Sequence, residues 1–312
     1  MSEKRIDMLK NQRVLVTGAT GQVARPIAEQ LDKSNEVWAA ARFSDPKARE
    51  EIEAQGIKTV NFTMGEEDLS HMPDVDYVIH CAVNVSPETT EQALTDNAEG
   101  TGFLMKRYRD ARAFFHMSSD SVYRDNPDPQ AVIDESATLG GYSTYSPHYA
   151  MSKLASEGVA RYQARELQLP TVIARLDVAY GLCGHGGVPT ALYQMMRGGI
   201  PYTRKSNGES FCCPIYETDI VEQVQGLLQH AAVPALTVNL GGDEAVSVEE
   251  MIRYIESLTG MSMKIEEAAL ATWQMKIVDA TLRKKLAGPC KTRWQDGIRT
   301  ILEQRFPGSV TA

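Results

Sequence analysis

The stretch RVLVTGATGQVA, residues 13–24, decides the fold of this chain. Val14 to Val16 reads as a buried strand, and glycines follow at positions 18 and 21. The first glycine lets the backbone turn sharply away from the strand, and the second lets it approach a ligand without a Cβ in the way. A strand, a glycine-rich turn and a helix in this order predict a cradle for the pyrophosphate of a dinucleotide. The residues assigned to the cradle are Gly18, Thr20, Gly21, Gln22 and Val23.

Strands and helices alternate outward from this stretch. The apolar patterns predict strands at 13–16, 36–41, 58–62, 77–82, 113–117 and 171–176, and helices at 21–31, 48–54, 90–111 and 147–167. Repeated strand–helix–strand units indicate an α/β fold with a doubly wound parallel Rossmann sheet and right-handed crossovers.

After Gly181 the regular alternation of expected strands and helices ends, and glycines, prolines and short elements dominate the sequence. Helices are expected again at 215–229, 247–258 and 279–286, and a strand at 236–240; Ser247 and Glu250 have the spacing of a capping box. We therefore predict a Rossmann domain over 11–181 plus about 215–240. Residues 182–214 and 241–312 form a smaller, partly interleaved C-terminal substrate lobe in this prediction.

Composition limits the class of protein and of partner. With 43% hydrophobic and 23% charged residues, the chain reads as an ordinary soluble globular protein. Its net charge of -9 argues against a nucleic acid or an anionic membrane as partner and leaves a small-molecule substrate. No apolar run is long enough to cross a bilayer, and the N-terminus lacks the apolar core of a signal peptide.

The cysteines bear on location and on metal binding. There are five, without a CxxC pair, which favours a reducing cytoplasmic location. Cys183 and His185 could ligate a metal, but nothing nearby completes a set of four ligands, so we expect a turn there and no metal.

The segment YAMSK, residues 149–153, carries the expected chemistry. Tyr149 and Lys153 lie at i and i+4 of an expected helix and so share one face. An ammonium near a phenol lowers the phenol's pKa from about 10 toward neutrality, so that it can exchange a proton with a carbonyl or alcohol oxygen as hydride moves at carbon. Ser119, at the end of a strand, can hydrogen-bond the same oxygen. We predict Ser119, Tyr149 and Lys153 as catalytic residues, with Tyr149 as acid/base and Lys153 also holding the nicotinamide ribose.

The end of the second strand indicates which dinucleotide binds. Ala41 occupies the place where an acidic residue meets a free ribose 2′-hydroxyl, and Arg42 follows it. A guanidinium can grip a 2′-phosphate through two hydrogen bonds. We therefore expect NADP (NADPH) rather than NAD, with Arg42 binding the cofactor; a solvated surface arginine is the alternative.

Several segments together resemble one family. They are TGATGQVA (17–24), DNAEGTGFL (96–104), FFHMSSDSVY (114–123), YAMSK (149–153) and IARLDVAYG (173–181). Over nearly its whole length the chain resembles the extended short-chain dehydrogenase/reductase family, in its NAD-dependent epimerase/dehydratase group. The resemblance assigns the catalytic hydroxyl to Ser119 and a structural role to Asn97. It also places along the cofactor Cys81, Ala82, Val83, Leu176 and Val178.

The sequence departs from the family pattern at positions that concern the substrate. UDP-galactose 4-epimerases have an Asn where this chain has Val178 and an Arg where it has Cys212, and both family residues contact the diphosphate. Sugar-nucleotide 4,6-dehydratases need Thr-Asp-Glu after strand five, and here Ser121 replaces the Glu. The turn after Arg42 is more similar to that of reductases that use NADPH on aromatic or aliphatic carbonyls.

Three functions follow as hypotheses. The main one is an NADP-dependent oxidoreductase that transfers hydride between nicotinamide and a carbonyl or secondary alcohol. The alternatives are an NAD(P)-dependent sugar or sugar-nucleotide epimerase and a non-catalytic dinucleotide-sensing protein. The resemblance further implies a homodimer, formed through the long helices expected at 90–111 and 147–167.

Overall fold

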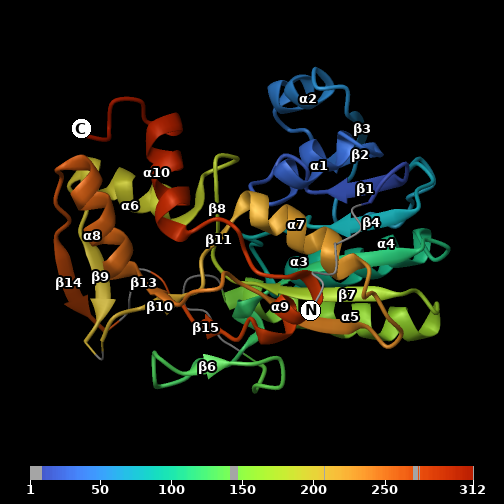
Figure 1. Cartoon of the computed structure of the whole chain (residues 1–312). Coiled ribbons are helices and arrows are strands. Elements are labelled where there is room, and N and C mark those ends of the chain that lie inside the picture. The colour runs from blue at the N-terminus through green and yellow to red at the C-terminus, as the bar shows by residue number, and fades with distance from the viewer. Residues whose placement is uncertain (1–8, 141–146, 207, 270–272, 274, 312) are drawn as a thin grey trace, which may run out of the picture.

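The computed structural model describes residues 9–140, 147–206, 208–269, 273 and 275–311 (Figure 1). Its centre is a seven-stranded sheet in which every pair of neighbours is parallel. In spatial order the strands are β12 (Leu236–Leu240), β7 (Thr171–Leu176), β5 (Ala113–Ser119), β4 (Tyr77–His80), β1 (Arg13–Thr17), β2 (Glu36–Ala41) and β3 (Lys58–Asn61). The order reverses between β1 and β4, which confirms the predicted doubly wound fold.

Helices cover both faces of the sheet (Figure 1). On one face α1 (Ala24–Asp32) and α7 (Glu217–Leu228) bury their apolar sides against the strands. On the other face lie α4 (Gly100–Arg107) and α5 (Pro147–Glu166). The polar helix α2 (Pro46–Glu53) buries only Ile52 and lies at the periphery. The central strands β1, β4, β5 and β7 are buried from both sides, as their largely apolar sequences predict, whereas the edge strand β3 is partly exposed.

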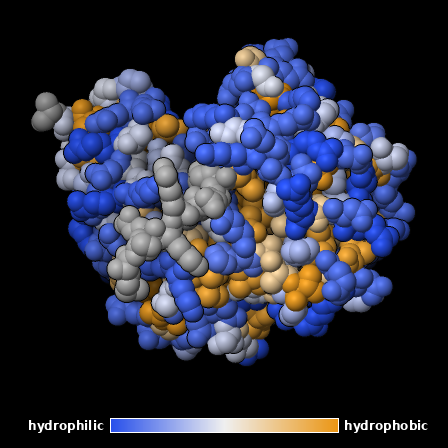
Figure 2. All heavy atoms as spheres, turned by 45° about the vertical axis from the view of Figure 1, so that its right-hand side comes forward, coloured by the Kyte–Doolittle hydropathy of each residue, from blue (hydrophilic) through white to orange (hydrophobic). Residues whose placement is uncertain are grey.

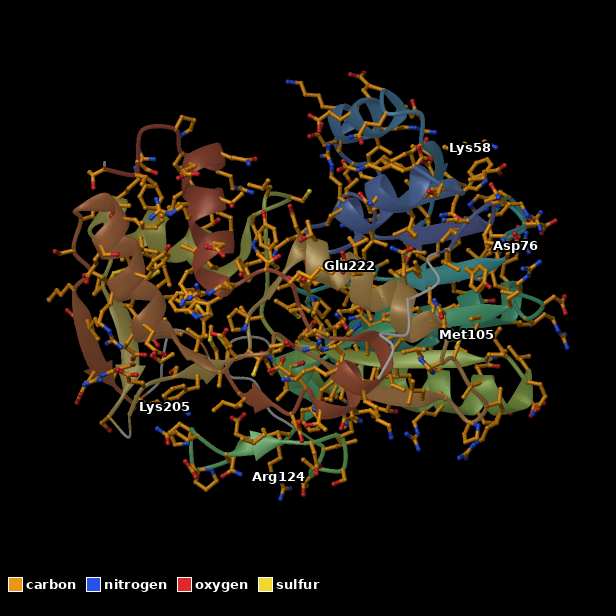
Figure 3. The ribbon with its side chains drawn as sticks, viewed as in Figure 1. Lys58, Asp76, Met105, Arg124, Lys205 and Glu222 are labelled. Carbon is orange, nitrogen blue, oxygen red and sulfur yellow. The ribbon has the colours of Figure 1, made fainter. Side chains whose placement is uncertain are left out.

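A second lobe packs beside the ends of the strands (Figure 1). Its core forms between α6 (Gly187–Gly198), α8 (Val248–Thr259) and α10 (Trp294–Arg305). Ser247 and Glu250 form the predicted capping box at the start of α8. The lobe also holds β9 (Tyr202–Lys205) paired with β14 (Ile265–Ala268), and β10 (Phe211–Cys212) paired with β13 (Val246–Ser247). Figure 3 places Lys205 in this lobe and Glu222 on α7 of the sheet domain.

Short elements connect the two parts. They are β8 (Ala179–Tyr180) with β11 (Ile215–Tyr216), and β6 (Val132–Ile133) with β15 (Ile277–Val278). The helix α9 (Thr281–Ala287) packs against α7 and β12 of the sheet domain. In the described residues no helix is long and apolar enough to cross a membrane.

The helix expected over 90–111 is instead divided. α3 (Thr90–Ala93) leads into a π-helical turn at Leu94–Glu99, and α4 ends at Arg107. Asn97 explains the irregular turn, because its side chain accepts from the backbone N–H of Asn84 at 2.8 Å and donates to its carbonyl at 2.9 Å. π-helical turns are frequent at functional sites, and this one fixes the loop that follows β4. Asn97 thus has the structural contacts that the resemblance implied.

Candidate functional site

A cavity of about 680 Å³ opens at the carboxyl ends of β1 and β4, where a doubly wound sheet binds its ligand. Figure 2 shows the surface hollowed between the two lobes. Twelve of the predicted residues line this cavity: Gly18, Thr20, Gly21, Gln22, Val23, Arg42, Cys81, Ala82, Val83, Tyr149, Lys153 and Leu176. Ser119 lies beside it and is buried, and Val178 packs against the core of the second lobe instead.

The glycine-rich turn has the geometry that a phosphate cradle needs. Gly18 has φ +75°, and a Cβ there would lie 2.9 Å from the backbone N and Cα of Ala82, so only glycine fits. The first turn of α1 holds no acidic residue, and no side chain caps its N-terminus at Val23. Its backbone N–H groups therefore remain available to an anion. The residues present fit the pyrophosphate of a dinucleotide.

Buried polar side chains fix the floor beneath the cradle. Thr17 Oγ1 accepts from the N–H of Ala82 at 3.1 Å and contacts His80 Nδ1 at 2.8 Å. His80 Nε2 reaches Thr101 Oγ1 at 3.1 Å. Burial, with the nearby charge of Lys153, lowers the pKa of His80 to about 3, so the ring is neutral at physiological pH. The ring of His80 on β4 thus links β1 and α4 through hydrogen bonds to Thr17 and Thr101.

Arg42 marks one end of the cavity. It is exposed, follows Ala41 at the end of β2, and lines the cavity together with Phe62, Thr63 and Met64. Ala41 provides no carboxylate there to hold a ribose 2′-hydroxyl or to repel a 2′-phosphate.

The residues predicted to be catalytic lie at the opposite end of the cavity. Tyr149 stands in the first turn of α5 and shares a side-chain hydrogen bond with Ser119, at the end of β5. Lys153, one turn later, donates through Nζ to the carbonyl of Met117 at 2.6 Å. Burial lowers the pKa of Lys153 to about 8.

The expected effect of Lys153 on Tyr149 was wrong for this structure. Burial, together with the charge of Asp120, raises the pKa of the Tyr149 phenol to about 12. The hydrogen bond with Ser119 lowers this pKa but does not offset the effect of burial. The ammonium of Lys153 is directed to the Met117 carbonyl and is itself desolvated, so the i,i+4 spacing alone does not acidify the phenol.

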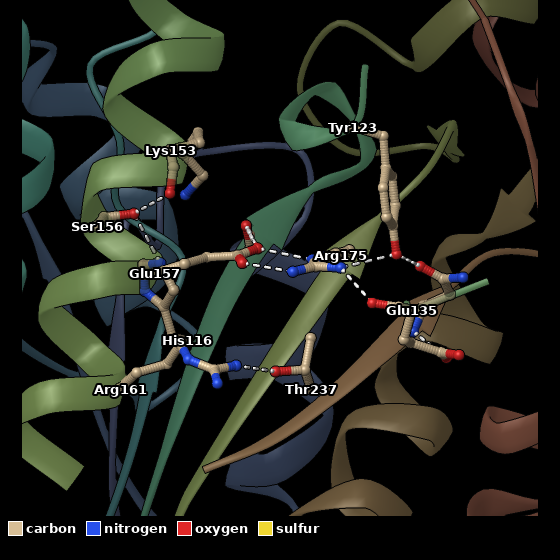
Figure 4. Close-up of polar contacts among 11 residues, drawn as sticks. His116, Tyr123, Glu135, Lys153, Ser156, Glu157, Arg161, Arg175 and Thr237 are labelled. Atoms are coloured by element: carbon tan, nitrogen blue, oxygen red, sulfur yellow. Dashed lines mark hydrogen bonds and ion pairs between the residues drawn. The ribbon is translucent and has the colours of Figure 1, made fainter. Parts of the chain in front are cut away.

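An ion pair beneath the site holds α5 to the sheet (Figure 4). Arg175 on β7 donates to both carboxylate oxygens of Glu157 on α5, at 3.0 and 2.8 Å, and both side chains are at most 3% exposed. Glu157 also accepts from Ser118 Oγ at 2.6 Å, and Arg175 donates to Tyr123. Burial disfavours the charge of Arg175, but its hydrogen bonds to Glu157 outweigh that and raise its pKa.

Sequence reasoning did not assign a pair of neighbouring carboxyls at the ends of β5 and β7. Ser119 and Leu176 are register partners on β5 and β7, and Asp120 and Asp177 follow them directly. Asp177 is 8% exposed; one oxygen accepts from the N–H of Cys213 at 2.6 Å, and the other is buried without a partner in the described chain. Burial and the charge of Asp120 raise the pKa of Asp177 well above its usual range. An acidic residue directly after each strand was the available signal.

His185, on the loop that leads into the second lobe, also lines the cavity. It was not assigned to the cofactor site from the sequence. Other lining residues outside the prediction are Ala24, Ala41, Phe62, Thr63, Met64, Asn84, Val85, Gln92, Asp96, Met117, Ser118 and Ala179. Most are sequence neighbours of predicted ones, so extending each motif would have found them. Among the described residues, no group of three or more His, Cys, Asp or Glu side chains is placed to hold a metal.

Comparison with curated proteins finds relatives of several activities. The chain is 25% identical over 273 residues to the uncharacterized UDP-glucose epimerase YtcB of Bacillus subtilis, covering 80% of this chain and 82% of that one. It is 23% identical to the trifunctional UDP-glucose 4,6-dehydratase/UDP-4-keto-6-deoxy-D-glucose 3,5-epimerase/UDP-4-keto-L-rhamnose-reductase of Arabidopsis thaliana. That match covers 94% of this chain and spans 47% of the longer protein.

Among solved structures, UDP-glucuronic acid 4-epimerase from Bacillus cereus in complex with NAD shares the fold, with a TM-score of 0.79 and 21% identity. The superposition covers 96% of this chain and 99% of that one. The profile of the NAD dependent epimerase/dehydratase family matches residues 14–241, which span the glycine-rich turn, Ser119, Tyr149 and Lys153. The chain belongs to the NAD dependent epimerase/dehydratase family.

Proposed function

We propose that this chain is a nicotinamide-dinucleotide-dependent enzyme that epimerises a sugar or a sugar nucleotide, with Tyr149 moving the proton. The observation that carries the proposal is that one cavity holds both the open glycine-rich cradle and, at its far end, Tyr149 and Lys153. Family membership and the epimerase relatives favour this reaction over the simple oxidoreductase that sequence reasoning preferred.

The residues divide the work between binding and proton transfer. When bound, the nicotinamide supplies a hydride acceptor and donor at the substrate carbon. The cradle from Gly18 to Val23 would hold its pyrophosphate. Tyr149 would take the proton from the substrate hydroxyl as the phenolate and return it to the carbonyl oxygen as the neutral phenol, while Ser119 donates to the same oxygen. Lys153 would hold the ribose once its Nζ leaves the carbonyl of Met117.

The substrate is where this chain differs from the UDP-galactose epimerases. Val178 packs into the second lobe and Cys212 is fully buried, so neither supplies the polar contact to a diphosphate that those enzymes have. Each lost contact to an anion weakens binding by about 1.5–3 kcal/mol. A substrate with fewer phosphate charges, such as a free sugar, is therefore included in the proposal.

The test separates net redox chemistry from epimerisation. Purified protein is incubated with UDP-glucose, UDP-glucuronic acid, glucose and glucuronic acid, with and without added NAD+ or NADP+. Proton NMR reads the stereochemistry of the products, and absorbance at 340 nm reads net cofactor reduction. We expect inverted sugar without net consumption of cofactor, and Tyr149→Phe is expected to be about 10²–10⁴-fold slower.

A second candidate is an NADP-dependent oxidoreductase: Arg42 favours NADP, and Val178 and Cys212 replace the diphosphate contacts of the UDP-galactose epimerases. Stoichiometric consumption of NADP+ or NADPH with no inverted sugar would replace the epimerase with this candidate. Dinucleotide binding without turnover of any compound would contradict the enzymatic proposal and favour the dinucleotide-sensing alternative. Full activity in Tyr149→Phe would contradict the assignment of proton transfer to Tyr149.

A further inference from the structure

The loop between β8 and α6, residues 181–186, forms part of the wall of the cavity through His185, although it leads into the second lobe. A Cβ on Gly184 would lie 3.0 Å from the N and Cα of Gln22, in the glycine-rich turn. Gln22 in turn donates through Nε2 to the carbonyl of Ala179 at 2.8 Å. The loop and the cradle therefore touch directly, and a group on the loop can reach what the cradle holds.

Side chains from two helices hold this loop in place. Glu217, at the start of α7, accepts from the N–H groups of Leu182 and Cys183 at 2.9 and 3.1 Å. Arg305, at the end of α10, donates to the carbonyls of Leu182 and Gly184 at 2.6 and 3.0 Å. The loop is thus fixed from the sheet domain and from the second lobe at once, which gives its side chains a defined direction.

His185 is the polar side chain that this loop presents to the cavity. Its Nδ1 accepts from the backbone N–H of Gly187 at 3.2 Å. Partial burial, and secondarily the charge of Arg305, lower the pKa of the imidazole, so the neutral ring prevails at physiological pH. In the neutral ring an accepting Nδ1 leaves the proton on Nε2. His185, which is solvent-exposed, therefore offers an N–H donor in the cavity that Gly21 and Gln22 also line.

We propose that His185 donates a hydrogen bond from Nε2 to the pyrophosphate of the bound dinucleotide. The cradle supplies backbone N–H groups from one side of the anion, and His185 supplies a side-chain donor from the other. The second lobe thereby contributes to cofactor affinity as well as to the substrate pocket. The inference rests on the proposed function only in requiring that a dinucleotide binds.

The test measures binding and needs no substrate. Titration calorimetry compares NAD+ and ADP-ribose, which share the pyrophosphate and differ in the nicotinamide. The variants are His185→Phe, which keeps a planar ring without a donor, and His185→Gln, whose amide nitrogen restores one. His230→Phe, an exposed histidine outside the cavity, is the matched control. Thermal melts verify that each variant is folded.

We expect His185→Phe to weaken NAD+ and ADP-ribose alike, by roughly tenfold, as for loss of one charge-assisted hydrogen bond. His185→Gln should recover most of that loss, and His230→Phe should bind as the wild type does. Unchanged affinity in His185→Phe, or a loss confined to NAD+, would overturn this inference while leaving the proposed function intact. A wild-type protein that binds neither compound would overturn both.

Discussion

Tyr149 and Lys153 share one helix turn, yet different neighbours set their charges. Tyr149 responds to burial, Ser119 and Asp120, whereas Lys153 responds to burial and to the thiol of Cys81. Both groups are shifted toward their neutral forms because the site is desolvated before a ligand arrives. At the residue scale, the activity should therefore change with pH as Lys153 titrates, because its pKa of about 8 lies near physiological pH.

Lys153→Arg tests this dependence. In the direction of carbonyl reduction Tyr149 starts protonated, so kcat/KM is expected to fall as pH rises through about 8, where Lys153 loses its proton. A guanidinium keeps its charge beyond pH 12, so the descending limb should move up in the variant. Initial rates across pH 6–10 measure this, and an unmoved limb would exclude Lys153 as its origin.

Arg42→Ala tests the cofactor preference, which we propose to be NADP over NAD. Removing the guanidinium should weaken NADPH binding about tenfold or more and leave NADH within about twofold, because only NADPH carries the 2′-phosphate. Fluorescence titration of both reduced dinucleotides gives the two affinities. Lys47→Ala, nearby on α2 but outside the cavity, serves as control. A wild type that prefers NADH would refute the assignment.

Asp177→Asn tests the buried carboxyl beside the site. Because the folded-state pKa of Asp177 lies above its unfolded value, its favourable contribution is complete below about pH 4 and is lost as pH rises through the folded pKa. The variant should therefore be more stable than the wild type near pH 8 and about equally stable near pH 4. Urea unfolding at both pH values measures the difference, with the exposed Asp110→Asn as control. A variant less stable at pH 8 would contradict this account.

At the scale of elements, β5, α5 and β7 behave as one unit because Glu157 and Arg175 join them. The ion pair positions the helix that carries Tyr149 without touching the cavity itself. Tyr123 extends the connection, since its hydroxyl bonds Asn239 on β12 at 2.6 Å.

Glu157→Gln should destabilise the fold by about 3–5 kcal/mol, because it leaves the buried charge of Arg175 without the carboxylate that neutralises it. Glu303→Gln, which breaks an exposed i,i+4 pair with Arg299 on α10, should cost no more than about 0.5 kcal/mol. Denaturant unfolding of both variants gives the comparison. Equal, small losses would mean that the buried pair does not tie these elements together.

The sequence predicted the elements whose signal is local. β2, β7 and β12 have the predicted bounds, and the glycine-rich turn and the capping box of α8 were read from spacing alone. The π-helical turn was not predictable, because Asn97 bends the helix through contacts with a distant loop. α6 and α10 were also missed, since α6 begins at Gly187 and ends in glycines and α10 has no capping side chain.

In the candidate site, too, residues in local motifs were predictable from the sequence, whereas residues brought together by the tertiary fold were not. Motif residues such as Gly18 and Lys153 were found in the sequence because their spacing is local. His185 and the pairing of Asp120 with Asp177 depend on which strands and lobes become neighbours. The pKa of Tyr149 was mispredicted for a related reason, since burial by the whole fold raises it and the fold directs Lys153 to the carbonyl of Met117.

At the scale of the whole molecule, we propose a homodimer formed through α4 and α5, as the family resemblance implies. Tyr162 on α5 is 62% exposed and would lie in such an interface. Light scattering should give twice the chain mass at micromolar concentration. Tyr162→Glu should shift the protein to monomer, whereas Ile200→Glu, equally exposed at the end of α6, should not. A monomeric wild type would refute this arrangement.

The central claim, that one cavity joins a dinucleotide cradle to a proton-transferring tyrosine, is tested most directly by a crystal structure with NADP+ bound. The account predicts the pyrophosphate on the turn from Gly18 to Val23, the adenosine 2′-phosphate at Arg42, and the nicotinamide beside Tyr149. A dinucleotide bound elsewhere, or one whose nicotinamide lies at the Arg42 end, would contradict it.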